Sequence, residues 1–216
     1  MKTAWQFKTA LLLTVCALAT PANADDDHNF FIRTGPAALF LSEGATVKAG
    51  GFVVPGGDIS IDRHFTGTLE IGYSFTPNFA VGFTGGYPPT IDINGGGTLS
   101  GVGRLGSVTY GPTALTAQYT YTGFGRIQPY VGAGPMFMIV FDNDDGALSN
   151  LKVKSAVGAV IQAGVDFNVT ESWGFYADVK KGYLRTKSTG SLGGAPVTAD
   201  VKLDPLVIGA GVKLRF

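Results

Sequence analysis

The sequence contains a single cysteine, and it lies close to the start of the chain. Cys16 falls within the first 24 residues, so the remainder has no cysteine and no disulfide can staple its fold. Long apolar runs are also missing. The best candidate, residues 129–141, is interrupted by Pro135 and is shorter than the ~20 residues that a membrane-spanning helix needs. These absences exclude a disulfide scaffold and a bundle of transmembrane helices.

The chain also lacks a charge of one sign. Its 16 basic and 16 acidic residues balance, and removal of Lys2 and Lys8 with the first 24 residues leaves a net charge of −2. Nucleic-acid-binding domains usually carry a clustered basic surface. We therefore expect no nucleic-acid partner.

The first 24 residues have the pattern of a secretory signal peptide. Two lysines are followed by an apolar stretch at residues 10–19, and Ala22-Asn23-Ala24 gives the small-x-small pattern of a cleavage site. The apolar stretch is too short to anchor the chain as a helix. We expect cleavage between Ala24 and Asp25, and one domain formed by residues 25–216.

Glycine, in contrast, is abundant. All 32 glycines follow residue 24, which is far above the usual share of ~7%. Glycine at this level disfavours helices, whereas sheets with tight turns and close strand contacts tolerate it. Two-residue alternation of apolar and polar side chains predicts eight strands. We place them at residues 30–40, 64–75, 79–88, 109–122, 128–141, 155–169, 173–184 and 203–216.

Short and long connections alternate between these strands. The short ones are residues 76–78, 123–127 and 170–172, and the long loops, rich in glycine and polar residues, are 41–63, 89–108, 142–154 and 185–202. Bacterial outer-membrane barrels have short periplasmic turns and longer extracellular loops. The pattern predicts an all-β fold, an eight-stranded antiparallel transmembrane β-barrel with both termini in the periplasm.

Each expected strand has one apolar face and one face that carries the charges. Leu69, Ile71 and Tyr73 share one face of their strand, for example, and Glu70 lies on the other. The charges are few and of both signs, which suits pairing in a narrow lumen, and the apolar faces are rich in aromatic residues, which suits lipid. Lipid cannot satisfy an open sheet edge, so the strands must close into a ring. Lys181 is the exception on an apolar face, where its amine could snorkel to the interface.

The positions that face the lumen change in character along the barrel. Near the periplasmic end we expect an ionic floor formed by Arg33, Asp166, Asp178, Lys180, Lys213 and Arg215. Further out we expect an apolar lumen formed by Leu39, Met136, Met138, Val140, Val160 and Val207. These apolar side chains either bind small apolar molecules or only fill a narrow barrel. In the first case a solute stopped by the floor would leave sideways, at sites that weaken strand pairing such as Pro112, Pro135 or Gly85-Gly86.

Three stretches resemble catalytic or ligand sites without their context. Residues 101–106 match a dinucleotide-binding pattern but lack the buried strand and helix that it requires. Residues 142–146 resemble part of a calcium loop, but their glycine falls on an expected ligand position. His28 and His64 show no Ser-His-acid constellation. We expect no enzyme activity, no cofactor and no metal site.

Several stretches are similar to the OmpW family of outer-membrane proteins. They are Phe31–Gly35, Pro112-Thr113 with Leu115 and Ala117–Tyr119, Pro129–Gly134, Phe141–Asn143, Leu203–Pro205 and Arg215-Phe216. The resemblance covers essentially the whole chain after residue 24 and departs at Val212–Leu214, where members commonly have Gly-Tyr. The family includes AlkL-type proteins linked to alkane uptake. The resemblance implies an eight-stranded barrel with a hydrophobic channel and lateral release.

These observations predict a passive channel for small hydrophobic molecules in the outer membrane of a Gram-negative bacterium. The expected partners are outer-membrane lipid and lipopolysaccharide, the hydrophobic solutes, and the assembly machinery, which would read a C-terminal strand that ends on Phe216. The alternative is a non-transporting surface barrel that acts in adhesion, host interaction, bacteriocin or phage reception, or envelope integrity.

Overall fold

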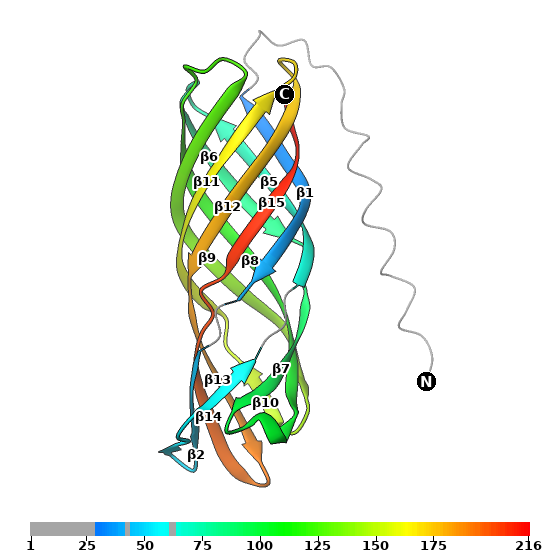
Figure 1. Ribbon diagram of the computed structural model, residues 1–216, viewed down its shortest axis with the longest axis vertical. Helices are drawn as coiled ribbons and strands as arrows, with labels where there is room; N and C mark the ends of the chain where they lie inside the picture. The colour runs from blue at the N-terminus through cyan, green and yellow to red at the C-terminus, as the bar shows by residue number, and fades with distance from the viewer. Residues whose placement is uncertain (1–28, 42–43, 61–63) are drawn as a thin grey trace, which may run out of the picture.

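Eight long antiparallel strands form a closed barrel (Figure 1). The computed structural model describes residues 29–41, 44–60 and 64–216. The barrel strands are β1 (Phe30–Phe40), β5 (His64–Ser74), β6 (Phe79–Gly86), β8 (Arg104–Thr120), β9 (Ile127–Asp145), β11 (Ala156–Asn168), β12 (Trp173–Tyr183) and β15 (Leu206–Arg215). Pairing of β1 with β15 and of β8 with β9 closes the ring. The expected fold is confirmed, while the cleavage site at Ala24 and Asp25, and His28, lie outside the described residues.

The two ends of the barrel differ. Short connections join β5 to β6, β8 to β9 and β11 to β12 at the end where the chain finishes, which is uppermost in Figure 1 and is called the turn end here. The long connections all lie at the opposite end. Among the described residues, no helix has the length and apolar character to cross a membrane.

The apolar faces of the barrel strands point outward and the charged faces point inward. Ile71, Phe83 and Phe175 are about half exposed on the outer surface, whereas Arg33 and Asp166 are buried inside. This is the sidedness that the sequence predicts. The side chain of Lys181 is partly buried, and its amine donates to the carbonyl oxygen of Asp204 at 2.5 Å.

The long connections are not the irregular loops that the sequence led us to expect. Their described residues form seven further strands and a short 3-10 helix, η2 (Ser100–Val102). The strands are β2 (Ala45–Ala49), β3 (Phe52–Val53), β4 (Gly57–Ser60), β7 (Thr90–Gly97), β10 (Ser149–Val153), β13 (Arg185–Leu192) and β14 (Ala195–Lys202). Strands β8 and β9 also run on into this region with 17 and 19 residues. We call this part of the molecule the extension.

Two Gly-Gly pairs build the outermost hairpins of the extension. Gly50 and Gly51 turn β2 into β3, and Gly193 and Gly194 turn β13 into β14, with φ values of 57° and 87° in both pairs. Two-residue hairpin turns of this type need positive φ at both central positions, and glycine adopts it without strain. Each dipeptide is a sequence signal for a hairpin, and the expectation of irregular loops did not take it into account.

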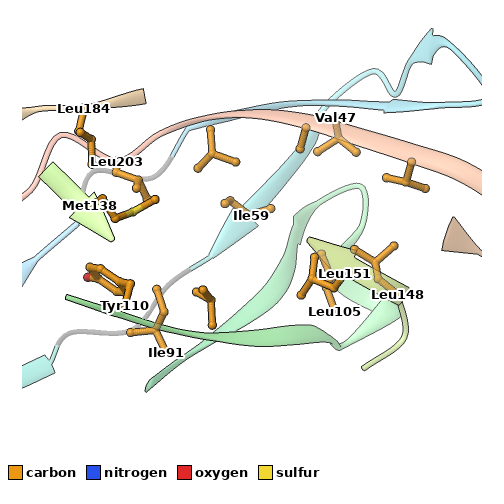
Figure 2. Packing of buried hydrophobic residues seen from close by; sticks show 14 of the residues in the cluster. Val47, Ile59, Ile91, Leu105, Tyr110, Met138, Leu148, Leu151, Leu184 and Leu203 are labelled. Atoms are coloured by element: carbon orange, nitrogen blue, oxygen red, sulfur yellow. The ribbon is translucent and has the colours of Figure 1, made fainter. Parts of the chain in front are cut away.

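The extension surrounds an apolar core of its own. Strands β10, β13, β14, β2 and β3 form one sheet, while β4 and β7 continue the barrel sheet next to β8. Figure 2 shows side chains from both sheets pointing toward one another. The buried members of this cluster are Leu39, Val47, Ile59, Ile91, Leu105, Val108, Tyr110, Met138, Leu148, Leu151, Leu184, Val197, Ala199, Val201 and Leu203.

Candidate functional site

A buried ionic cluster closes the barrel interior toward the turn end. Arg33 on β1 donates to both carboxylate oxygens of Asp166 on β11, at 3.0 and 2.8 Å. Lys213 on β15 donates to the same carboxylate at 2.6 Å. The Arg33 guanidinium also lies over the rings of Phe31 and Tyr130, at 4.5 and 4.1 Å from their centroids. The arginine is therefore fixed from several strands at once.

A second set of contacts extends this cluster across the barrel. Glu70 on β5 accepts from Arg33 and lies 3.2 Å from the amine of Lys180. Gln118 on β8 accepts from Arg33 and donates to Glu70, both at 3.0 Å. Asp178 pairs with Lys180 and accepts from the Tyr130 hydroxyl at 3.2 Å. We call Arg33, Glu70, Gln118, Tyr130, Asp166, Asp178, Lys180 and Lys213 the ionic floor.

The ionic floor is electrically balanced and tightly packed. Arg33, Lys180 and Lys213 are matched by three carboxylates, which lets the charges remain buried. Glycine provides the room for the larger groups. A Cβ at Gly82 would lie 2.4 Å from the Gln118 amide nitrogen, and one at Gly164 would lie 2.6 Å from the Tyr130 hydroxyl. The interior is thus filled at this level.

The floor that the sequence predicts and the one in the structure overlap without being identical. Arg215 stands apart: it is half-buried at the turn end and donates to the carbonyl oxygen of Thr170 at 3.3 Å. Glu70, Gln118 and Tyr130 belong to the floor but were absent from the predicted set. Glu70 and Gln118 lie on the inward parity of their strands and could have been added on that signal. Tyr130 likewise lies on the inward parity of its strand, as Met136 and Met138 do, but its contact with Asp178 could not be read from that signal.

Five of the six residues of the predicted apolar lumen line one of two cavities. One cavity lies in the barrel, on the side of the floor that faces away from the turn end, and we call it the barrel cavity. Its lining includes Leu39, Met136, Val160 and Val207. Met138 lines a second cavity within the extension, the extension cavity, and Val140 packs against the apolar cluster around it. Their role in binding solutes stays a prediction. Lys180 belongs to the ionic floor and also borders the barrel cavity, so the floor closes this cavity toward the turn end.

The extension cavity was not predicted from the sequence. Its walls come from connections that we expected to be polar loops, including Val47, Ile91, Leu105, Leu151 and Val201. Leu39, which lines the barrel cavity, belongs to the same apolar cluster as Tyr110, Met138 and Leu203, which line the extension cavity. The space between the side chains is narrow in both, so the passage of a solute requires side-chain movement.

The barrel wall is interrupted beside the barrel cavity. Strand β6 pairs with β8 only from Phe79 to Thr84, and β7 then takes over as the neighbour of β8 from Thr90. Between these ladders, Gly85 to Tyr87 face Gly111 to Thr113 without pairing to them, although both segments are described. Gly85, Gly86, Pro112 and Thr113 all line the barrel cavity. We call this interruption the wall gap.

Proline contributes directly to the wall gap. The backbone N–H groups of Thr120 and Tyr110 point toward β6 and β7, where they donate to Asn78 and Pro89, so even-numbered residues of β8 face that side. Pro112 is one of these positions and has no N–H to donate. Pro135, by contrast, lies in an unbroken register between β9 and β11, opposite Ala159, and is not part of the gap.

A basic groove runs along the outside of the extension. Its lining includes four cations, Lys154, Arg185, Lys187 and Lys202, against one carboxylate, Asp200. The groove also includes Val157, which is 69% exposed on the outer surface. Apolar and cationic surfaces therefore adjoin where the barrel meets the extension.

The acidic stretch at residues 142–145 serves the local structure of the extension. Asp145 accepts the backbone N–H groups of Leu151 and Asn150, each at 2.9 Å. These hydrogen bonds hold the pKa of the Asp145 carboxyl below its usual value. The side chain of Asn143 likewise accepts from the backbone N–H of Val153. The group secures the turn between β9 and β10.

Comparison with known proteins assigns the chain to a family. The sequence model of the OmpW family matches residues 26–216. The chain belongs to the OmpW family. It is 35% identical over 170 residues to the outer membrane protein AlkL of Ectopseudomonas oleovorans, with 79% of this chain and 74% of AlkL covered. It is 31% identical over 206 residues to the dibenzothiophene metabolism operon protein PahQ of Pseudomonas aeruginosa, with 95% and 97% covered.

Solved structures show the same architecture as this OmpW-family barrel. The crystal structure of the outer membrane protein OprG from Pseudomonas aeruginosa has a TM-score of 0.81 at 25% identity, covering 87% of this chain and 95% of OprG. The solid-state NMR structure of AlkL in DMPC lipid bilayers has a TM-score of 0.71 at 32% identity, covering 87% and 90%. The chain is an outer-membrane barrel of a Gram-negative bacterium, and its outward apolar faces contact membrane lipid.

Proposed function

We propose that this barrel is a passive channel through which small hydrophobic molecules enter, with release sideways into the membrane, and that it has no catalytic role. The observation that carries the proposal is the presence of two apolar cavities, one in the extension and one in the barrel, on the side of the ionic floor that faces away from the turn end. An apolar solute gains free energy when it leaves water for such cavities. The floor offers an apolar solute no such gain, because a solute that entered the floor would have to separate buried ion pairs.

The path starts in the extension, which we place outside the cell with the turn end in the periplasm. A solute enters the extension cavity, passes Met138, and reaches the barrel cavity beside Met136 and Val160. Methionine is flexible and polarisable, and such side chains adapt to solutes of different shape. The wall gap at Pro112 then provides the exit toward lipid.

The relatives support this class of solute. The name of PahQ connects that protein with the metabolism of dibenzothiophene, an uncharged aromatic molecule. The sequence resemblance to AlkL-type proteins points to uptake of alkanes. Both kinds of molecule are apolar, so both would gain free energy on leaving water for the apolar cavities.

The uptake proposal can be tested with Met136→Asp. A carboxylate in the barrel cavity would be costly to bury and would attract water, so we expect at least tenfold slower n-octane uptake by cells that express the variant. Thr198→Asp, on the exposed face of β14, is the matched control and should transport normally. Heat-modifiable mobility on gels verifies that both variants assemble. Uptake by the correctly assembled Met136→Asp variant at the rate of the unaltered protein would overturn the proposal.

The lateral exit can be tested with an alkyl diazirine as a photoreactive solute. We expect cross-links at Thr113 and Tyr87, which border the wall gap, and labelling of the surrounding lipid. Replacement of Pro112 by alanine restores a backbone N–H that faces β6. Because this N–H can pair β8 with β6 across the wall gap, lipid labelling should decrease. Cross-links concentrated at Asp166 and Lys213 would instead indicate passage through the floor.

One feature favours the alternative of a surface barrel without transport. Phe52 and Val53 form β3, next to the tip of the β2–β3 hairpin, and are 81% and 55% exposed. An apolar tip on a polar extension is suited to contact with another macromolecule. Hydrocarbon uptake no faster than in cells without the protein would favour this function, and Phe52→Ser should then abolish the contact.

We further propose that the basic groove binds the phosphates of lipopolysaccharide, with an acyl chain beside Val157. Lys154, Arg185 and Lys202 provide cations just beyond the apolar belt, where the phosphates of this lipid lie. Replacement of all three by alanine should lower the amount of lipid A that co-purifies by about tenfold. Arg126→Ala, in a turn at the opposite end, should not change it. Equal lipid A content in both variants would contradict the proposed contact.

The last strand carries the proposed signal for outer-membrane assembly. Leu214 and Phe216 lie at its end, and both are exposed on the outward surface, at 37% and 50%. The backbone of Phe216 also exchanges two hydrogen bonds with Phe30, so the signal residue ends up in the closing seam of the barrel. Deletion of Phe216 should reduce the yield of heat-modifiable barrel in the outer membrane.

A further inference from the structure

The only aromatic hydroxyl in the core of the extension belongs, among the described residues, to Tyr110. The residue is 4% exposed and lines the extension cavity. Its hydroxyl oxygen is buried and has no hydrogen-bond partner in the described part of the chain. Figure 2 shows the ring at the end of the cluster where Met138, Leu184 and Leu203 gather. The side chains labelled at this end of the cluster are all apolar.

A buried hydroxyl without a partner is unfavourable, because folding removes its hydrogen bonds to water and returns nothing. Phenylalanine would fill nearly the same space without this loss. Other buried tyrosines of the barrel interior do have partners: Tyr130 donates to Asp178, and the Tyr176 hydroxyl lies 3.4 Å from that of Thr68. Packing accounts for the ring of Tyr110 and leaves its hydroxyl unexplained.

Tyr110 also occupies a fixed place on the path. Its backbone N–H donates to the carbonyl oxygen of Pro89 at 3.2 Å, at the point where β8 changes its neighbour from β6 to β7. Two positions further along β8, Pro112 borders the wall gap. Pro89 lines the barrel cavity, so Tyr110 lines one cavity and is hydrogen-bonded to a residue that lines the other.

We propose that the Tyr110 hydroxyl is a hydrogen-bonding point that selects among apolar solutes, and that the preferred solutes carry one uncharged oxygen acceptor on a hydrocarbon skeleton, as a medium-chain ketone or ether does. This inference rests on the proposed function and names its solute class. An acceptor that enters the cavity loses its bonds to water, and the hydroxyl restores one of them. A hydrocarbon gains no hydrogen bond from the Tyr110 hydroxyl. An ionised solute finds no partner of opposite charge among the described residues that line the extension cavity.

The test compares two probes of equal chain length, 2-decanone and n-decane, binding to the protein in lipid nanodiscs. Tyr110→Phe should weaken the binding of 2-decanone about fivefold, the effect of one ordinary hydrogen bond, and leave n-decane binding unchanged. The infrared carbonyl band of bound 2-decanone should lie at lower frequency in the unaltered protein than in the variant. Tyr121→Phe, which alters an exposed hydroxyl near the turn end, is the matched control and should affect neither probe.

The outcomes separate the two proposals. Loss of affinity for both probes in Tyr110→Phe, or for neither, would overturn the role of the hydroxyl and leave the apolar channel in place. An equal frequency of the carbonyl band of bound 2-decanone in the unaltered protein and in Tyr110→Phe would also overturn the role of the hydroxyl. Binding of neither probe to the unaltered protein would overturn the channel itself.

Discussion

At the level of single residues, Asp166 is the centre of the ionic floor. It is 0% exposed and accepts from both Arg33 and Lys213. A buried charge is tolerated only while its partner is present, and removal of one partner typically costs about 3–5 kcal/mol. The stability of the lumen therefore depends more on keeping these charges matched than on any single contact.

Replacement of Asp166 by asparagine should accordingly destabilise the barrel by roughly 3 kcal/mol, because two buried cations lose their shared carboxylate. Urea-induced unfolding in lipid vesicles measures this change. Asp200→Asn breaks a pair with Lys187 that is 3.7 Å long and well exposed, and it should change the free energy of unfolding by less than about 0.5 kcal/mol. A similar small effect in both variants would show that the floor is permeated by water.

At the level of elements, the extension has a core that is separate from the ion pairs of the floor. Leu151 on β10 is 4% exposed, and a Cβ placed on Gly106 of β8 would lie only 2.4 Å from its side chain. Short strands are unstable alone, and buried side-chain contacts of this kind hold them together. We therefore expect the extension to open locally while the barrel stays folded.

We expect Leu151→Ala to lower the local stability of the extension by about 2–5 kcal/mol through loss of buried contacts and creation of a cavity. Hydrogen exchange of the β10, β13 and β14 amides should accelerate, while the barrel retains its heat-modifiable mobility. Val53→Ala, at a position that is 55% exposed, should leave exchange unchanged. Simultaneous loss of barrel stability would show that the two parts fold as one unit.

The sequence was informative about the barrel and much less so about the extension. In the barrel, lipid on one side and a narrow lumen on the other enforce strict alternation, so the strand positions and their inward faces could be predicted. In the extension, alternation such as Val197, Ala199 and Val201 is present but is hidden among glycine and polar residues. Its glycines are hairpin and contact positions, whereas composition alone suggested open loops. The wall gap depends on a change of strand partner, which no local pattern records.

At the level of the whole molecule, a filled lumen should make the protein a poor ion conductor. We expect no conductance steps of the size of an open porin in planar bilayers, because the floor spans the interior with matched charges. Replacement of Arg33 and Glu70 together by serine keeps the remaining charges balanced and removes bulk, so conductance should rise several-fold. Replacement of the surface pair Lys187 and Asp200 by serine should leave the conductance unchanged. High conductance of the unaltered protein would contradict a closed floor.

The length of β9 has a consequence for the surroundings of the cell. At ~3.4 Å per residue and a tilt of ~40°, its 19 residues rise roughly 50 Å, whereas the hydrocarbon layer is only ~30 Å thick. We therefore expect the mouth of the extension to stand in the hydrated layer outside the hydrocarbon, where apolar molecules dissolve poorly. Shortening β8 and β9 in paired two-residue steps would lower that mouth without changing which side chains face inward.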